Sequence, residues 1–310
     1  MASKLTAEVF SGVWSAMSTP LCECGKVDID AVGKLVEHEI RLGLKGLFIA
    51  GTAGEGPWLA DAERYVLARS VAAASRGRLA VAMQITDNSA ERMIENIERY
   101  KDTGVDMFVI APPFFHVGAT QEFIYELFIK VIEASPLPIG IYNRGKFSSV
   151  LIEPDTLAKI ISHPKVMLVK DSASQPEYTK VILEVRNRRR GELYAFTGNE
   201  FDCVNFLREG YDGLLLGGGC FNGAMAVEIF KLCREGKFEE AQQRQEHMNE
   251  VMYRVFGGKD IKCWMAGQKT LMVRLGIFNT ARSFFSYKLN DECSREIDAV
   301  IAENKHYLLP

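Results

Sequence analysis

The residues best suited to chemistry in this sequence are a lysine and a tyrosine that each end a short apolar segment. Lys170 ends residues 166–170, and Tyr142 ends residues 137–142 one repeat earlier. Burial disfavours the charged ammonium group and lowers the pKa of a lysine, so its free amine can attack a ketone and form a Schiff base. A phenol beside such an amine can move protons while a carbon–carbon bond breaks. The plain alternatives are a lysine that turns to water and pairs with Asp171, and a tyrosine that caps the core.

A third candidate group is the glycine-rich segment 51–56, which reads Gly-Thr-Ala-Gly-Glu-Gly and follows another apolar segment. Closely spaced glycines let backbone N–H groups approach an anion, and Thr52 adds a hydroxyl. The pattern is a weak signal by itself. Beside Lys170 and Tyr142 it predicts a cradle for a carboxylate.

The elements that must position these residues are short strands that alternate with helices. We predict strands at residues 12–17, 46–50, 79–84, 107–110, 139–142, 167–170, 193–197 and 213–216. Their ends recur on average about every 28 residues, enough for one strand, one helix and two loops. The strands are continuously apolar, as in a parallel sheet that is buried on both faces. No GxGxxG sequence follows the first strand, so an α/β fold of the closed (β/α)8 TIM-barrel type is favoured over an open doubly wound sheet.

Helix signals fit the same repeat. Asp61 and Ser89 are predicted N-caps, and the pair 153–154, Glu-Pro, predicts another helix start. Gly104, Gly191 and Gly210 lie where helices are expected to stop.

The chain after the eighth strand predicts a helical appendage. A helix at residues 223–235 completes the barrel, and three more are expected at 238–256, 262–275 and 291–308. We therefore predict a barrel over residues 1–235 and a C-terminal three-helix extension over 236–310. The apolar stripes of the extension are expected to pack on the barrel or on a neighbouring subunit.

Composition excludes several classes of protein. The 310 residues carry 37 basic and 40 acidic side chains, a net charge of −3, which provides no basic field for nucleic acid or an anionic membrane. No apolar run approaches the ~18 residues needed to span a bilayer. Residues 1–10 lack the charged-then-apolar pattern of a secretory signal. Composition therefore predicts an ordinary globular chain but does not indicate its chemistry.

The cysteines and histidines favour neither a disulfide framework nor a metal site. Seven cysteines are scattered along the chain, and the one close pair, Cys22 and Cys24, has no second pair or nearby histidine to complete a zinc site. The five histidines are likewise dispersed. We predict free thiols, no metal, no cofactor and a reducing cytoplasmic location.

The three motifs together resemble the dihydrodipicolinate synthase / N-acetylneuraminate lyase family. They are residues 51–55, Gly-Thr-Ala-Gly-Glu; 141–143, Ile-Tyr-Asn; and 169–172, Val-Lys-Asp-Ser. The resemblance covers nearly the whole chain. It implies a class I, Schiff-base-forming pyruvate aldolase built on a (β/α)8 barrel with a C-terminal helical extension, and a homotetramer.

The resemblance also implies roles for individual residues. Lys170 would form the Schiff base with pyruvate or another 2-keto acid, and Tyr142 would shuttle protons. Thr52 and the backbone of Ala53 would hold the carboxylate. The substrate-binding residues that we predict are Gly51, Ala53, Arg144, Gly198, Asn199, Glu200, Leu215 and Gly217.

Three departures from the family pattern bear on the substrate. Ala53 stands where a second hydroxyl residue is usual. Residues 112–116, Pro-Pro-Phe-Phe-His, stand where a tyrosine usually reaches into the neighbouring subunit's site, so His116 or water would have to replace it. Phe147 stands where the synthases carry an arginine for the second substrate, while Arg144 and Lys146 are the nearby cations. A lysine-pathway synthase is therefore disfavoured.

The last two strand ends favour a polyol substrate. Asn199 and Glu200 follow the seventh strand, where sugar-acid members of the family accept hydrogen bonds from hydroxyl groups. A purely structural alternative is that an acidic residue at the start of a helix interacts favourably with the helix dipole. Residues 217–219, Gly-Gly-Gly, follow the eighth strand, where barrels often bind phosphate. The simpler explanation of these glycines is that they leave room for the backbone to approach its neighbours closely.

The leading hypothesis is a lyase that reversibly cleaves a 2-keto-3-deoxy sugar acid, or a related 4-hydroxy-2-keto acid, to pyruvate and an aldehyde. Alternatives on the same barrel are an enzyme like dihydrodipicolinate synthase or N-acetylneuraminate lyase, and a keto-deoxy sugar acid dehydratase. A catalytically silent barrel that binds a keto acid is a rival of another class. Phosphate-directed chemistry independent of Lys170 is the last of these hypotheses.

Overall fold

Eight parallel strands close into a barrel in the computed structural model, which describes residues 5–310. Residues 1–4 lie outside the described residues, and they are the first four of the ten residues that lack the pattern of a secretory signal. Each strand pairs with the next, and the first pairs with the last. The strands are β1 Val13–Ser15, β2 Gly46–Ile49, β3 Ala80–Gln84, β4 Met107–Ile110, β5 Ile139–Asn143, β6 Val166–Asp171, β7 Tyr194–Thr197 and β8 Gly213–Leu216. The predicted (β/α)8 TIM barrel is confirmed.

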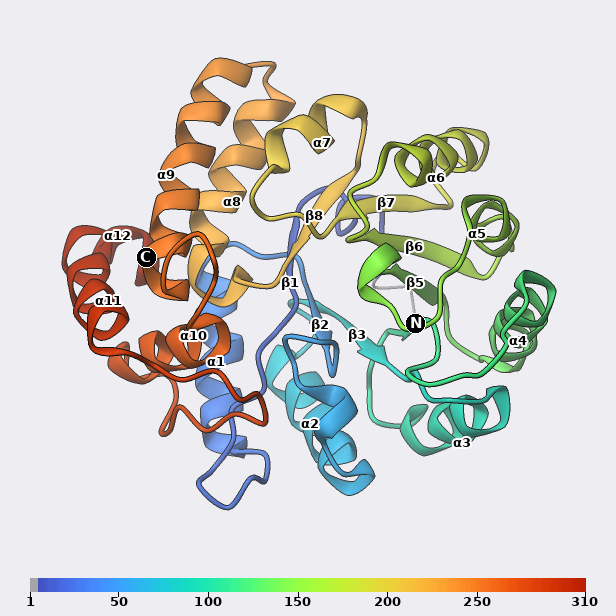
Figure 1. Ribbon diagram of the computed structural model, residues 1–310, viewed down its shortest axis with the longest axis horizontal. Coiled ribbons are helices and arrows are strands. Elements are labelled where there is room, and N and C mark those ends of the chain that lie inside the picture. Colours follow the sequence, from blue (N-terminus) through green and yellow to red (C-terminus); the bar gives the residue numbers. More distant parts are fainter. Residues whose placement is uncertain (1–4) are drawn as a thin grey trace.

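Helices surround the barrel, as Figure 1 shows, and the C-terminal helices gather on one side, next to α8. The helices of the ring are α1 Ile29–Arg41, α2 Asp61–Ser75, α3 Ala90–Tyr100, α4 Gln121–Ala134, α5 Pro154–Ile161, α6 Pro176–Arg188, α7 Cys203–Glu209 and α8 Gly219–Arg234. Short 3₁₀ turns, η1 Gly56–Trp58 and η2 Gly145–Phe147, follow β2 and β5. Residues 5–310 contain no helix with both the length and the apolar character needed to cross a bilayer.

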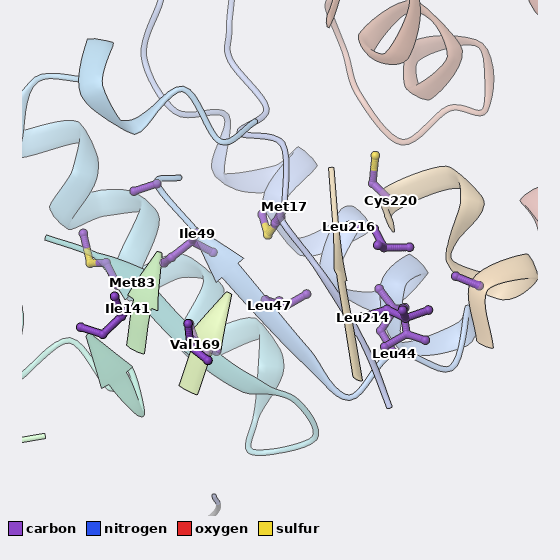
Figure 2. Close-up of a cluster of buried hydrophobic side chains, with 14 of the residues drawn as sticks. Met17, Leu44, Leu47, Ile49, Met83, Ile141, Val169, Leu214, Leu216 and Cys220 are labelled. Carbon is purple, nitrogen blue, oxygen red and sulfur yellow. The ribbon is translucent and has the colours of Figure 1, made fainter. Parts of the chain in front are cut away.

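Side chains alternate between two cores along each strand. Outward-facing residues such as Ile49, Ile141, Val169 and Leu214 pack between the strands and the helices, as Figure 2 shows. Inward-facing residues fill the barrel itself, among them Trp14, Phe48, Tyr142, Leu168, Phe196 and Leu215. Because the side-chain period of a strand is two, Lys170 belongs with Leu168 on the inward face. The strands therefore carry Tyr142 and Lys170 to the same interior surface.

Local signals explain the helix starts. Ser89 caps α3, since its side chain accepts a hydrogen bond from the Arg92 N–H at 3.3 Å, as predicted. Helix α5 begins at Pro154, also as predicted. Asp61 is the first residue of α2 rather than its cap, because its carboxylate pairs with Arg99 at 2.8 Å instead of capping the helix.

The C-terminal extension contains four helices rather than three: α9 Phe238–Phe256, α10 Trp264–Arg274, α11 Asp291–Glu303 and α12 Lys305–Leu308. Asn304 separates the last two, and its side chain contacts His247 of α9 at 2.8 Å. This tertiary contact interrupts the helix that periodicity predicts as continuous. The division at residue 235 stays a prediction, and the outer core runs across it from Phe230 to Met248.

The prediction of free thiols is wrong for one pair. Cys22 and Cys24 form a disulfide, with their Cα atoms 5.3 Å apart, in the turn between the bridge partners Leu21 and Val27. This antiparallel bridge folds the turn back on itself and brings the two side chains together. The other five cysteines are free and buried. The cytoplasmic location stays a prediction.

Candidate active site

Lys170 and Tyr142 are direct neighbours at the carboxyl ends of β6 and β5. The strand register pairs Tyr142 with Lys170, and the Lys170 amine lies 4.4 Å from the centre of the Tyr142 ring. The ring of Phe48, on β2, lies 5.2 Å from the same amine on the inward face. The predicted pairing of the two residues across adjacent strands is therefore confirmed.

Burial controls the charge of Lys170, which is 6% exposed. Loss of hydration lowers the pKa of its amine, and the positive charge of Arg144 lowers it further. Tyr142 and Glu200 act in the opposite direction, but the net effect is a lowered pKa. The amine is thus prepared to lose its proton more easily than a lysine in water.

Asp171 does not neutralise Lys170. One oxygen of its carboxylate accepts hydrogen bonds from the Asn143 amide and the Ala173 N–H, both at 3.0 Å, and the other accepts from the Tyr211 hydroxyl at 2.9 Å. No ion pair joins Lys170 to a carboxylate within residues 5–310. The plain explanation of Lys170 as one half of a surface ion pair with Asp171 is excluded.

Tyr142 faces several groups that favour its phenolate. Burial alone would raise the pKa of the phenol, but the charges of Lys170 and Arg144 and hydrogen bonds with Thr52 and Ser172 outweigh it, so the pKa is lowered. A phenol with a lowered pKa exchanges its proton more readily. The contact with Thr52 also ties β5 to the glycine-rich loop.

The loop after β2 lies across the mouth of the barrel from β5 and β6. Thr52 is partly exposed and Ala53 is buried against the inner core, with 4% of its surface exposed. Gly51 has no room for a side chain, because a Cβ there would lie 2.6 Å from the ring of Phe48. The three residues predicted to hold a carboxylate therefore lie together, close to Tyr142.

The β7 end contributes Gly198, Asn199 and Glu200. A Cβ on Gly198 would lie 2.1 Å from the Ser172 hydroxyl and 2.9 Å from Cε of Lys170, so glycine leaves room for both side chains. Glu200 is buried; burial raises its pKa, and its carboxylate accepts a hydrogen bond from the Gly218 N–H at 2.7 Å. Asn199 is partly exposed, and its side-chain oxygen accepts from the Phe201 N–H. The Glu200 carboxylate, which lies just after β7, thus interacts electrostatically with the Lys170 amine.

Two further predicted residues lie at β8. Gly217 is near Glu200, since a Cβ there would be 3.5 Å from the Glu200 carboxylate, and its carbonyl accepts from the Gln268 amide at 3.2 Å. Leu215 pairs in register with Trp14 and is 1% exposed within the barrel interior. The substrate contact predicted for Leu215 stays a prediction.

Arg144 is the only predicted binding residue with a permanent charge. It follows β5, is partly exposed, and makes no side-chain hydrogen bond or ion pair with any residue from 5 to 310. Phe147 lies outside on η2 with 62% of its surface exposed. His116 packs on Phe123 of α4, with 4.5 Å between ring centres, and its role in a neighbouring subunit's site stays a prediction.

Two residues of the site were absent from the predictions. Ser172 hydrogen-bonds Tyr142, and Phe48 lies beside the lysine amine. Strand alternation carries the signal for both, because Ser172 is two residues after Lys170 and Phe48 is flanked by outward-facing Leu47 and Ile49. Within residues 5–310 no three His, Cys, Asp or Glu side chains are grouped to hold a metal ion.

The fold and the site define a class of protein: a (β/α)8 barrel with a desolvated lysine and a tyrosine facing a glycine-rich loop at the carboxyl ends of its strands. Residues 9–290 match the Dihydrodipicolinate synthetase family, and the chain belongs to that family.

Individual relatives agree with this assignment. The chain is 25% identical over 293 residues to the 4-hydroxy-tetrahydrodipicolinate synthase of Gluconobacter oxydans (strain 621H), covering 94% of this chain and 96% of the relative. It is 29% identical over 247 residues to the enzyme of that name from Listeria welshimeri, covering 79% and 83%.

Solved structures share the fold. A monomeric dihydrodipicolinate synthase variant superposes with a TM-score of 0.85 at 20% identity, covering 96% of this chain and 97% of that one. CdNal from Clostridium difficile, solved in complex with mannosamine, gives 0.82 at 18%, covering 94% and 98%.

Proposed function

We propose that the protein is a Schiff-base lyase that reversibly cleaves a 2-keto-3-deoxy sugar acid, or a related 4-hydroxy-2-keto acid, to pyruvate and an aldehyde. One observation carries the proposal: Lys170 is buried at the barrel mouth without a carboxylate partner, beside a tyrosine with a lowered pKa. Membership of the family supports it. Packing alone does not require Lys170 or Tyr142 here, because a leucine would fill the same space without the free-energy cost of burying a polar group.

In the first half of the reaction the neutral Lys170 amine attacks the C2 ketone of the substrate. The carbinolamine loses water, and the product is a protonated imine between Lys170 and C2. Tyr142 supplies the proton that leaves with the hydroxyl as water. Thr52 and the N–H of Ala53 hold the adjacent carboxylate, so that C2 stays within reach of the amine.

In the second half the imine accepts the electrons of the breaking bond. Tyr142, now a phenolate, takes the proton of the C4 hydroxyl; the C3–C4 bond breaks, the aldehyde leaves and an enamine remains on Lys170. Protonation at C3 followed by hydrolysis releases pyruvate and restores the amine. The positive charge of Arg144 favours the phenolate that this step needs. The protonated imine carries a second positive charge at the place of the Lys170 nitrogen.

The far part of the substrate faces Arg144 on one side and Glu200 with Asn199 on the other. We assign Glu200 and Asn199 to the hydroxyl groups and Arg144 to a distal polar or anionic end. Gly198, Gly217 and Leu215 shape the wall between them. The assembly that would surround this site is proposed to be a homotetramer.

The names of the curated relatives favour one second candidate, a synthase that condenses pyruvate with an aldehyde carrying its own carboxylate. In that case Arg144, which has no partner among residues 5–310, would bind the second carboxylate in place of the residue that Phe147 replaces.

A substrate panel separates these activities. The protein is incubated with 4-hydroxy-2-keto acids of four to seven carbons, with and without a second carboxylate, and pyruvate and aldehyde are measured together. Equal release of both supports the lyase. A keto product without aldehyde indicates the dehydratase, consumption of added pyruvate with a carboxylated aldehyde indicates the synthase, and thermal stabilisation by a keto acid without turnover indicates a silent binding protein.

A further inference from the structure

Glu55, in the loop that carries Thr52, has two unusual properties. Its backbone is left-handed, with φ of 54°, although it is not glycine. Its side chain is completely buried and forms an ion pair with Lys269 of α10, which is completely buried as well. A strained non-glycine residue persists only where its surroundings hold it in place.

The C-terminal extension provides the contacts that hold Glu55 in this conformation. One oxygen of the Glu55 carboxylate accepts hydrogen bonds from the Ser283 hydroxyl, at 2.9 Å, and from the Phe284 N–H. The Lys269 amine also donates to the carbonyls of Thr19, at 2.9 Å, and Arg282, at 2.7 Å. The carboxylate is therefore fixed by α10 and by the segment between α10 and α11.

The backbone of the loop transmits this anchoring to the site. The Glu55 N–H donates to the carbonyl of Thr52 at 3.0 Å, and the Gly56 N–H donates to the carbonyl of Gly51 at 3.1 Å. Gly56 allows this turn to close, because a Cβ there would lie 1.8 Å from the carbonyl oxygen of Ala50. A continuous series of contacts thus runs from Lys269 through Glu55 to Thr52, and from Thr52 to Tyr142.

We propose that Glu55 and Lys269 are positioning residues, through which the C-terminal extension sets the place of Thr52 and Ala53 for the substrate carboxylate. The inference rests on the proposed function, since it concerns the loop assigned to that carboxylate. Stability alone is a poor reason for the pair, because a buried ion pair is often no more stabilising than apolar residues of the same volume. Position is a better explanation, because a displaced loop would bind the carboxylate of pyruvate more weakly while leaving the Lys170 amine unchanged.

The test is the dependence of Schiff-base trapping on pyruvate concentration. Each variant is mixed with pyruvate and borohydride, and the initial rate of adduct formation on Lys170 is measured by mass spectrometry together with the melting temperature. For Glu55→Gln and Lys269→Met we expect the half-saturating pyruvate concentration to rise about tenfold, with a maximal rate within about twofold of wild type.

The double variant, Glu55→Gln with Lys269→Met, separates position from stability. It leaves no unpaired buried charge, so its melting temperature should recover relative to the single variants, while the half-saturating concentration stays raised. Recovery of both values would overturn the proposal. Should the charge variants fail to fold, Ser283→Ala keeps both charges and removes one hydrogen bond, and a rise of about threefold is expected; no rise would overturn the proposal.

Arg186→Met is the matched control. It breaks the Arg186–Asp212 ion pair, which joins the end of α6 to the segment before β8 at the opposite end of the barrel. We expect a lower melting temperature and unchanged pyruvate dependence. If wild type forms no adduct, both the proposed function and this inference are contradicted. If wild type forms the adduct and the Glu55 and Lys269 variants match it in half-saturation, only the inference fails.

Discussion

At the scale of single residues, the reactivity of Lys170 is a balance between burial and three charged or titratable groups. Burial and Arg144 favour the neutral amine, whereas Tyr142 and Glu200 favour the ammonium form. Arg144 is unusual in this set because it lowers the pKa of both Lys170 and Tyr142. It therefore promotes the free amine that begins the proposed reaction and the phenolate that accepts the C4 hydroxyl proton in its second half.

Replacing Arg144 should shift the pH dependence of trapping. In Arg144→Gln the pKa of Lys170 rises, because a neighbouring positive charge is lost, and less free amine is present at neutral pH. At saturating pyruvate the trapping rate should fall at pH 7 and converge with that of wild type at high pH. Lys146→Gln, which removes an exposed cation two residues away, should leave the profile unchanged. A profile for Arg144→Gln that superimposes on wild type would refute this account.

At the scale of elements, α1 carries a polar residue that the proposed reaction does not use. The Glu39 carboxyl is fully buried, and the Ser15 hydroxyl is the polar group placed beside it. Burial raises the pKa of Glu39 from 4.5 to about 8. The folded protein therefore binds a proton that the unfolded chain has already released, and the free energy of unfolding must fall as pH rises through this window.

Glu39→Gln should remove that pH dependence. The variant is expected to match wild type near pH 5 and to exceed its unfolding free energy by about 2–4 kcal/mol near pH 8, because wild type must either keep the proton or bury a charge. Urea unfolding at several pH values measures the difference. Glu37→Gln, on the exposed face of the same helix, should show no gain that grows with pH. A constant difference for Glu39→Gln across pH 5–8 would contradict the assignment.

Local patterns predict the elements well and the contacts between distant elements poorly. The neighbourhood of Lys170 and Tyr142 was predictable, because consecutive strands of a parallel barrel are adjacent and end at one edge. The pair Glu55–Lys269 was not, since nothing near either residue indicates a partner more than 200 positions away. Asn304 interrupts a helix for the same reason: its contact is with His247. The Cys22–Cys24 bridge depends on a turn that composition does not reveal.

At the scale of the whole molecule, the mouth of the barrel exposes apolar side chains that water does not favour. Phe115, Val117, Phe147 and Leu151 are 70%, 78%, 62% and 46% exposed, in the segments after β4 and β5. The two segments are neighbours, since the Gln121 amide donates to the carbonyl of Leu151. Exposed apolar side chains on neighbouring segments are candidates for an interaction surface, and a second copy of the chain is the partner we expect.

Sedimentation velocity tests this expectation. Wild type should sediment as an oligomer, and the double variant Phe115→Ser with Phe147→Ser should dissociate at concentrations at least tenfold higher than wild type does. Ile29→Ser changes an exposed apolar residue outside this patch and should not alter assembly. Monomeric wild type, or an oligomer indifferent to the double substitution, would rule out this surface as the interface.

Covalent trapping decides whether Lys170 forms a Schiff base with a 2-keto acid. Wild type is incubated with pyruvate and borohydride, digested, and the modified peptide is identified by mass. The account predicts one adduct per chain, on Lys170, that is retained in Tyr142→Phe at a lower rate and absent in Lys170→Ala. No adduct on wild type, or the same adduct on Lys170→Ala, would contradict it.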